Sequence, residues 1–283
     1  MKFELEALGT HWWIELPSGT KKSLKAEFLN VIEEFEDNYS RFKPESLIGR
    51  LNTNKTLPSP PAELINMLRF ALDTYQATDG LFNISIGSRL EKIGYGAESD
   101  DQSEVSNNLH EDLIISEDSI NLSDTTRIDL GGFGKGWLLE KLAGWLEHKG
   151  IHNFLLNGGG DITVRGKEQE ILIENPEVES EYIGKVILKN SSLASSSNIK
   201  RAWEKDGKKH AHIQHPSGKE LEGILSMHIL APSILFADTF ATIFLLTDRE
   251  TRLEYAGLYN LEFLEVHKNL QTFSTPGFEF QPN

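Results

Sequence analysis

Short stretches of alternating apolar and polar residues recur along this chain, and they constrain its fold more than any other feature. Residues 2–8 and 11–16 predict two strands joined at Gly9-Thr10, and residues 112–122 predict a hairpin around Glu117-Asp118. Further strands are predicted within residues 128–130, 152–157, 158–166, 169–194 (two or three), 200–216 (a hairpin with a basic tip), 224–232, 261–268 and 270–276.

Helical spacing of apolar residues is confined to a few longer segments. The predicted helices cover residues 22–37, 137–150 and 235–247, and a further helix within residues 58–80 starts after the prolines and stops near Gly80. Residues 38–52 read as an irregular loop, and residues 97–111 as a polar, acidic surface loop or lid. Because strands outnumber helices and several form sequential hairpins, we expect an α+β fold with a mainly antiparallel sheet rather than a doubly wound one.

The composition excludes several classes of protein. With 283 residues and 39% apolar content, the chain can bury a sizeable core. A net charge of −15 argues against a general nucleic-acid surface, and the absence of cysteine excludes disulfides and zinc thiolate sites. The start MKFELEALGTHWW has no apolar signal core, and no apolar run is long enough to span a bilayer. We therefore expect a cytoplasmic protein, unless an export signal has been removed.

The stretch DLGGFGKGW, residues 129–137, lies between a predicted strand and a predicted helix. It fits neither the Walker loop nor the dinucleotide fingerprint, since Gly134-Lys135 is followed by Gly136 and then Trp137. The free N–H groups of the helix start can still bind an anion, and Lys135 adds a positive charge. Asp129 would then serve a ribose, a base or a metal. The alternative is a tight turn with close helix packing.

Three further motifs carry polar residues suited to chemistry. NGGGD, residues 157–161, predicts either a second loop lining a ligand slot or a hairpin turn. In ADTFAT, residues 237–242, Asp238 and Thr242 share a helical face and suit Mg²⁺ held with a phosphate, although this spacing also occurs in surface and capping residues. In HAHIQHPSG, residues 210–218, His212 is either a general base or a structural histidine.

The order of these motifs resembles the ApbE family of FAD:protein FMN transferases. The chain also carries the family's LGT (8–10), SRFKPESLIGRLN (40–52) and DGLFN (79–83) motifs, so the resemblance spans nearly the whole sequence. The resemblance implies one domain over residues 1–283 with a T-fold-like sheet core.

Several positions depart from the family pattern. Asn83, Gly134 and Ser217 are mild changes, whereas His215 replaces an aspartate and Ala241 replaces a carboxylate found in some members. We expect His215 to alter flavin contacts or acceptor recognition, and Ala241 to weaken the hold on Mg²⁺.

The resemblance also implies a role for individual residues. His212 would be the catalytic base, and Asp238, Thr242 and the carbonyl of Gly132 would bind Mg²⁺. The residues implied to contact FAD are Leu8, Gly94, Tyr95, Asp129, Lys135 and Ile213.

The implied reaction is the Mg²⁺-dependent transfer of FMN from FAD to a Thr or Ser hydroxyl of a target flavoprotein, with release of AMP. Family targets include subunits of quinone reductases, Rnf-type complexes and flavin reductases. The chain lacks the acceptor motif D-G-x-[ST]-x-[AT]-T, so the modification would occur on another protein. The alternatives are an FAD pyrophosphatase that uses water, a non-catalytic FAD-binding protein, and an interaction module.

Overall fold

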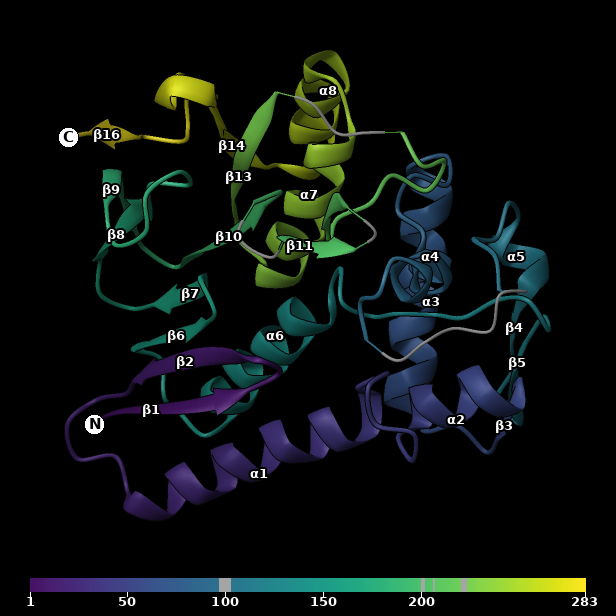
Figure 1. Ribbon diagram of the computed structural model, residues 1–283. Helices are drawn as coiled ribbons and strands as arrows, with labels where there is room; N and C mark the ends of the chain where they lie inside the picture. Colours follow the sequence, from purple (N-terminus) through teal and green to yellow (C-terminus); the bar gives the residue numbers. More distant parts are fainter. Residues whose placement is uncertain (97–102, 200–201, 206, 220–222) are drawn as a thin grey trace. The chain divides into compact units, whose positions relative to one another are not determined.

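An antiparallel sheet organises the first of two compact units in the computed structural model, which describes residues 1–96, 103–199, 202–205, 207–219 and 223–283. The first unit comprises residues 1–33, 133–201 and 221–283. Its main sheet has eight strands in the order β1-β2-β6-β7-β10-β13-β14-β15 (Figure 1). The strands are Lys2–Ala7, Thr10–Glu15, Phe154–Gly158, Asp161–Arg165, Ser191–Ser197, Ile224–Ala231, Glu262–His267 and Thr272–Ser274.

Both faces of this sheet are covered within the first unit. On one face, α6 (Gly134–His148) contacts β6 and β7, and α7 (Ile234–Leu246) contacts β7, β10 and β13. On the other face, a small sheet in the order β16-β9-β8 closes an apolar core that includes Leu193 and Leu264. The small sheet consists of β8 (Gln169–Glu174), β9 (Tyr182–Leu188) and β16 (Gln281–Pro282), and the unit also contains α8 (Arg249–Tyr259) and η2 (Lys268–Leu270).

The second unit comprises residues 34–132 and 202–220. The helix α1 (Lys22–Tyr39) belongs to both units, since it begins in the first and ends in the second. The other elements are α2 (Leu47–Asn54), β3 (Thr56–Pro58), α3 (Ala62–Ala77), η1 (Ile84–Ile86), α4 (Gly87–Lys92), α5 (Leu109–Asp112), β4 (Leu113–Ile115), β5 (Ser119–Leu122), β11 (Ala202–Lys205) and β12 (Lys208–Ala211). Strands β3, β5 and β4 form a small antiparallel sheet, and β11 pairs with β12.

The α+β class with a mainly antiparallel sheet is confirmed, together with the predicted hairpins at residues 112–122 and 200–216. The basic tip of the second hairpin lies partly outside the described residues. No helix in the described part of the chain is long and apolar enough to cross a membrane. The prediction of one domain over residues 1–283 stays a prediction.

Two local predictions were wrong, and a third holds for only part of its described residues. Residues 38–52 contain the start of α2, because the Ser46 hydroxyl caps the N–H of Gly49 at 2.8 Å. Residues 128–130 form no strand; Ile128 instead donates its N–H to the side chain of Asn52. In the predicted surface loop 97–111, residues 97–102 lie outside the described residues, whereas Ser103, Ser106 and Leu109 are buried.

Candidate functional site

The helix α6 begins inside the glycine-rich stretch, three residues earlier than predicted. Its N-cap residue, Phe133, offers no side-chain cap, which leaves the first N–H groups of the helix to find other partners. The N–H of Gly136 donates to Asp238 Oδ2 at 2.7 Å. The carboxyl group of Asp238 on α7 therefore takes the place of a side-chain cap.

Gly136 must be glycine because α6 and α7 approach closely at this point. A Cβ at residue 136 would lie 2.8 Å from Asp238 Cβ and 3.0 Å from the carbonyl oxygen of Ile234. The alternative reading of the glycine stretch, a turn with close helix packing, is thus confirmed at this glycine.

A second carboxylate makes the capping of α6 and α7 reciprocal. Glu140, on α6, accepts hydrogen bonds from the Ser233 hydroxyl and the Ile234 N–H at 2.9 Å each, at the start of α7. Each helix therefore supplies an acidic side chain to the N-terminus of the other. These two contacts fix the place of Asp238 in the first unit.

Asp238 belongs to a cluster of three ionisable groups, in which the two carboxyl groups are buried and the lysine is half-buried. Asp161 is 1% exposed, contacts Lys135 Nζ through Oδ2, and accepts the N–H of Ser195 through Oδ1 at 3.1 Å. The pKa of Asp238 is raised to about 8, because burial and the carboxylate of Asp161, which raise it, outweigh Lys135 and the Gly136 N–H, which lower it. Two carboxyl groups thus share one lysine in a buried setting, and a second positive charge would be stabilised there.

Thr242 follows Asp238 by one helical turn on α7, as predicted, and is half-buried. Gly132 belongs to the second unit, whereas Asp238 and Thr242 belong to the first. A metal site made from these three residues therefore stays a prediction. Among the described residues, no group of three or more His, Asp or Glu side chains is arranged to hold a metal ion. A metal held here would need carbonyl, hydroxyl or substrate oxygens beside the carboxylates.

In the second unit, Asp129 shapes the glycine stretch. Its Oδ1 accepts the N–H of Gly131 at 2.7 Å, and its Oδ2 accepts Arg41 Nε at 2.8 Å. The Arg41 side chain is 2% exposed and also donates to the carbonyl of Tyr95 at 2.8 Å. Arg41 therefore neutralises Asp129 and ties it to the 94–95 segment.

The Gly94-Tyr95 pair lies directly after α4. Gly94 has φ +87°, a conformation that favours glycine, and the Tyr95 ring stacks on Trp203 with centroids 5.1 Å apart. Trp203 Nε1 donates to the carbonyl of Ile93 at 2.7 Å. The two rings form an aromatic surface on the second unit that includes one predicted flavin contact.

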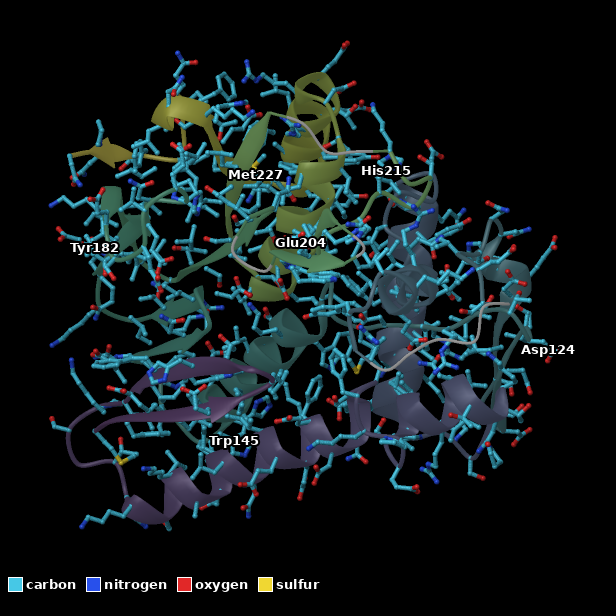
Figure 2. All side chains as sticks on the ribbon, viewed as in Figure 1. Asp124, Trp145, Tyr182, Glu204, His215 and Met227 are labelled. Atoms are coloured by element: carbon cyan, nitrogen blue, oxygen red, sulfur yellow. The ribbon has the colours of Figure 1, made fainter. Side chains whose placement is uncertain are left out.

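The segment after β12 holds the predicted base. His212 is half-buried and Ile213 is 6% exposed. In the following turn, which Figure 2 marks by its label on His215, Nδ1 of His215 accepts the N–H of Ser217 at 3.2 Å. Burial, Lys219 and Arg89 together lower the pKa of His215, so its Nδ1 stays available as an acceptor near neutral pH. His215 thereby provides a side-chain acceptor within this turn.

Two predicted turns position the remaining residues. Leu8 has φ +51° and Gly9 φ +67°, so the pair forms a tight hairpin turn between β1 and β2. In NGGGD, Gly159 and Gly160 both have positive φ between β6 and β7, which confirms the hairpin reading. The same turn ends at the buried Asp161.

Sequence reasoning missed four residues that shape these sites: Arg41, Glu140, Asp161 and Ser195. Only Asp161 carried a local signal, because it ends the quoted NGGGD motif. The partners of the other three residues are far away in the sequence.

The arrangement of strands and helices is that of solved flavin transferases. A crystal structure of the ApbE protein from Thermotoga maritima aligns with a TM-score of 0.87 and 21% identity, covering 99% of this chain and 98% of that one. The flavin transferase ApbE from Vibrio cholerae aligns with a TM-score of 0.80 and 19% identity, covering 99% of each chain.

Two curated relatives of this chain have the same name, FAD:protein FMN transferase. The FAD:protein FMN transferase of Vibrio cholerae is 24% identical over 87% of this chain and 80% of its own length. That of Escherichia coli K12 is 24% identical over 96% of this chain and 85% of its own length. The family model for the ApbE family matches residues 8–264, and the chain belongs to this family.

Proposed function

We propose that this chain is an FAD:protein FMN transferase, the name that its curated relatives carry. A Ser or Thr hydroxyl of a target protein attacks the phosphorus on the FMN side of FAD. The O–P bond to FMN forms, the P–O bond to AMP breaks, and the hydroxyl proton passes to His212. The observation that supports this reaction is the cluster that Lys135 forms with the buried carboxyl groups of Asp161 and Asp238 at the start of α6.

The donor set at this cluster fits a hard divalent cation. Asp238 and Asp161 are both buried carboxyl groups that share one lysine. By resemblance to the family, Asp238, Thr242 and the Gly132 carbonyl would hold Mg²⁺. When bound, Mg²⁺ would offset the charge of the diphosphate and stabilise the charge that develops on the leaving AMP.

The residues of the cluster have separate tasks in this proposal. Lys135 provides a positive charge for the diphosphate, and Asp161 orients its ammonium group. Asp238 is oriented by the N–H of Gly136, so the carboxylate reaches the site in one fixed position.

The flavin nucleotide is assigned to the other residues of the family pattern. We propose that Leu8, Gly94, Tyr95, Asp129, Lys135 and Ile213 contact FAD. The stacked pair of Tyr95 and Trp203 supports the assignment of Tyr95, since an aromatic surface suits a flat ring system. Arg41 and Gly131 support that of Asp129, because they hold its carboxylate in place.

The partner would be a flavoprotein with a Thr or Ser acceptor motif, such as a subunit of a quinone reductase, an Rnf-type complex or a flavin reductase. We propose that the modification takes place in the cytoplasm.

The test is incubation of the chain with FAD, Mg²⁺ and a protein domain that bears the acceptor motif. Mass spectrometry would detect FMN on the acceptor, and chromatography would separate free FMN and AMP. We expect one AMP for each modified acceptor. Free FMN with an unmodified acceptor would instead indicate an FAD pyrophosphatase, and unchanged FAD would indicate a non-catalytic binder.

A further inference from the structure

A buried histidine on the main sheet of the first unit is linked by hydrogen bonds to the candidate site. His228, on β13, is 5% exposed and lies directly opposite Ser195 of β10. Its Nδ1 lies 2.8 Å from the Ser195 hydroxyl, and its Nε2 lies 3.0 Å from the Ser226 hydroxyl. The imidazole is therefore fixed at both ring nitrogens.

The surroundings of this polar group are apolar. Leu193 precedes Ser195 by two residues, and Leu264 is the register partner of His228 on β14. Both leucines belong to the core between the main sheet and the small sheet. Packing alone would be satisfied by an apolar side chain at residue 228, and burying polar groups there is costly unless they are hydrogen-bonded. Packing therefore does not explain why residue 228 is a histidine with both ring nitrogens in hydrogen-bond contact.

The connection to the site runs through the main chain of Ser195. Its N–H donates to Asp161 Oδ1 at 3.1 Å, while the other oxygen of Asp161 contacts Lys135. The register between β7 and β10 ends at the pair Leu193 and Ile162, so the N–H of Ser195 is available to a side chain. Because side chains alternate along a strand, Asp161 lies on the face opposite to its neighbour Ile162, which is a core residue.

We infer that His228 is a positioning residue for Asp161. The imidazole fixes the side chain of Ser195 on one face of the sheet, and the Ser195 N–H fixes the carboxylate of Asp161 on the other. Asp161 in turn orients Lys135. The contribution of His228 to FMN transfer rests on the proposed function, whereas its effect on Ser195 does not.

Two substitutions test the two ring nitrogens of His228 one at a time. The short amide of His228→Asn can reach Ser195 in the place of Nδ1, and the longer amide of His228→Gln can reach Ser226 in the place of Nε2. Each variant leaves one hydroxyl without its former partner, so a general loss of packing would affect both alike. Ser197→Ala is the matched control. Ser197 lies on β10, the strand of Ser195, and its hydroxyl donates to the carbonyl of Leu225 at 2.9 Å.

The first measurement is hydrogen exchange of the Ser195 amide in the protein without FAD or metal. We expect His228→Gln to speed this exchange about tenfold, while His228→Asn and Ser197→Ala stay near wild type. Equal exchange in the Asn and Gln variants, or unchanged exchange in His228→Gln, would overturn the inference.

The second measurement is transfer kinetics. We expect His228→Gln to lower kcat roughly 10- to 100-fold with little change in the acceptor KM, and His228→Asn to restore most of it. If exchange responds but kcat does not, His228 positions Ser195 without serving the reaction, and the inference fails for catalysis. If the wild type transfers no FMN at all, the proposed function fails, and the exchange result still decides the structural claim.

Discussion

Asp238 accepts the N–H of Gly136 at 2.7 Å, and a Cβ on residue 136 would lie 2.8 Å from Asp238 Cβ. The close approach of α6 and α7 thus excludes a side chain at residue 136, and the N–H of this residue orients Asp238. Glu140 completes the arrangement by accepting the hydroxyl of Ser233 at the opposite helix start. The candidate metal ligand is therefore part of the helix packing as well as of the proposed chemistry.

Gly136→Ala should destabilise the protein and abolish transfer. The added methyl group meets Asp238 and the main chain of Ile234, and overpacking of this kind costs roughly 1–3 kcal/mol. Gly144→Ala on the same helix is the control, because a Cβ there meets no atom within 4 Å; it should stabilise the helix by about 1 kcal/mol. Urea unfolding of both variants is the measurement. Equal stability of the two would contradict the packing account.

His212→Ala should retain FAD binding and lose transfer by about 10²- to 10⁴-fold, the usual contribution of a general base. His215→Asn is the companion variant that tests the second histidine of this segment, since an amide oxygen can still accept the N–H of Ser217 and keep the turn. Fluorescence titration with FAD and a single-turnover assay provide the two readouts. An unchanged rate in His212→Ala would move the base elsewhere, with His215 as the first residue to test.

We predict that stability depends on pH through Glu265, a buried carboxylate that lies outside the candidate site. Burial raises its pKa, but hydrogen bonds from Arg249, His267 and Arg252 outweigh burial and hold the pKa below the usual range of a glutamate. A lowered carboxyl pKa adds stability above the unfolded value, and this stability is lost as the pH falls through the folded pKa. Chemical unfolding between pH 7 and pH 3 should therefore show a drop below pH ~4.5.

The matched variants are Glu265→Gln and Glu254→Gln, the second at an exposed position on α8. Glu265→Gln should cost about 3–5 kcal/mol at neutral pH, because it leaves buried Arg252 without its carboxylate. Its stability should also vary less with pH than that of the wild type. An equally steep acid loss in Glu265→Gln would assign the effect to other groups.

Proteolysis within residues 97–111 tests the prediction of a single domain. The first unit is built from three chain segments and the second from two, so one cut in this region releases neither unit intact. We expect the nicked chain to unfold in one transition by calorimetry. Two fragments that separate and stay folded would show independent domains.

The fold class could be predicted because hydrophobic alternation and turn residues are local signals. Helix α2 was missed because its N-terminal cap, Ser46, lies in a polar segment with a proline. The roles of Lys135 and Asp238 could be proposed because each lies in a short motif. The links from Asp161 to Ser195 and from Ser195 to His228 could not be predicted, because they depend on strand pairing across more than 30 residues.

The metal site gives the sharpest prediction. Asp238 and Thr242 lie one helical turn apart, and the Gly132 carbonyl is the proposed third protein ligand. Two phosphate oxygens of FAD and water would complete the octahedron that Mg²⁺ requires. Metal binding without FAD should therefore be weak, and FAD and Mg²⁺ should raise each other's affinity, because coupling between two ligands is reciprocal.

Asp238→Asn separates the structural role of this residue from its metal-binding role. The amide oxygen can still accept the N–H of Gly136, so the variant should fold. It removes the one carboxylate among the proposed ligands and should abolish transfer, whereas Thr242→Val loses a neutral donor and should have a smaller effect. Calorimetric titration of Mg²⁺ into the apo and FAD-loaded forms of each variant is the measurement. If FAD-loaded Asp238→Asn binds Mg²⁺ as tightly as wild type, or transfers FMN at the wild-type rate, the metal assignment is wrong.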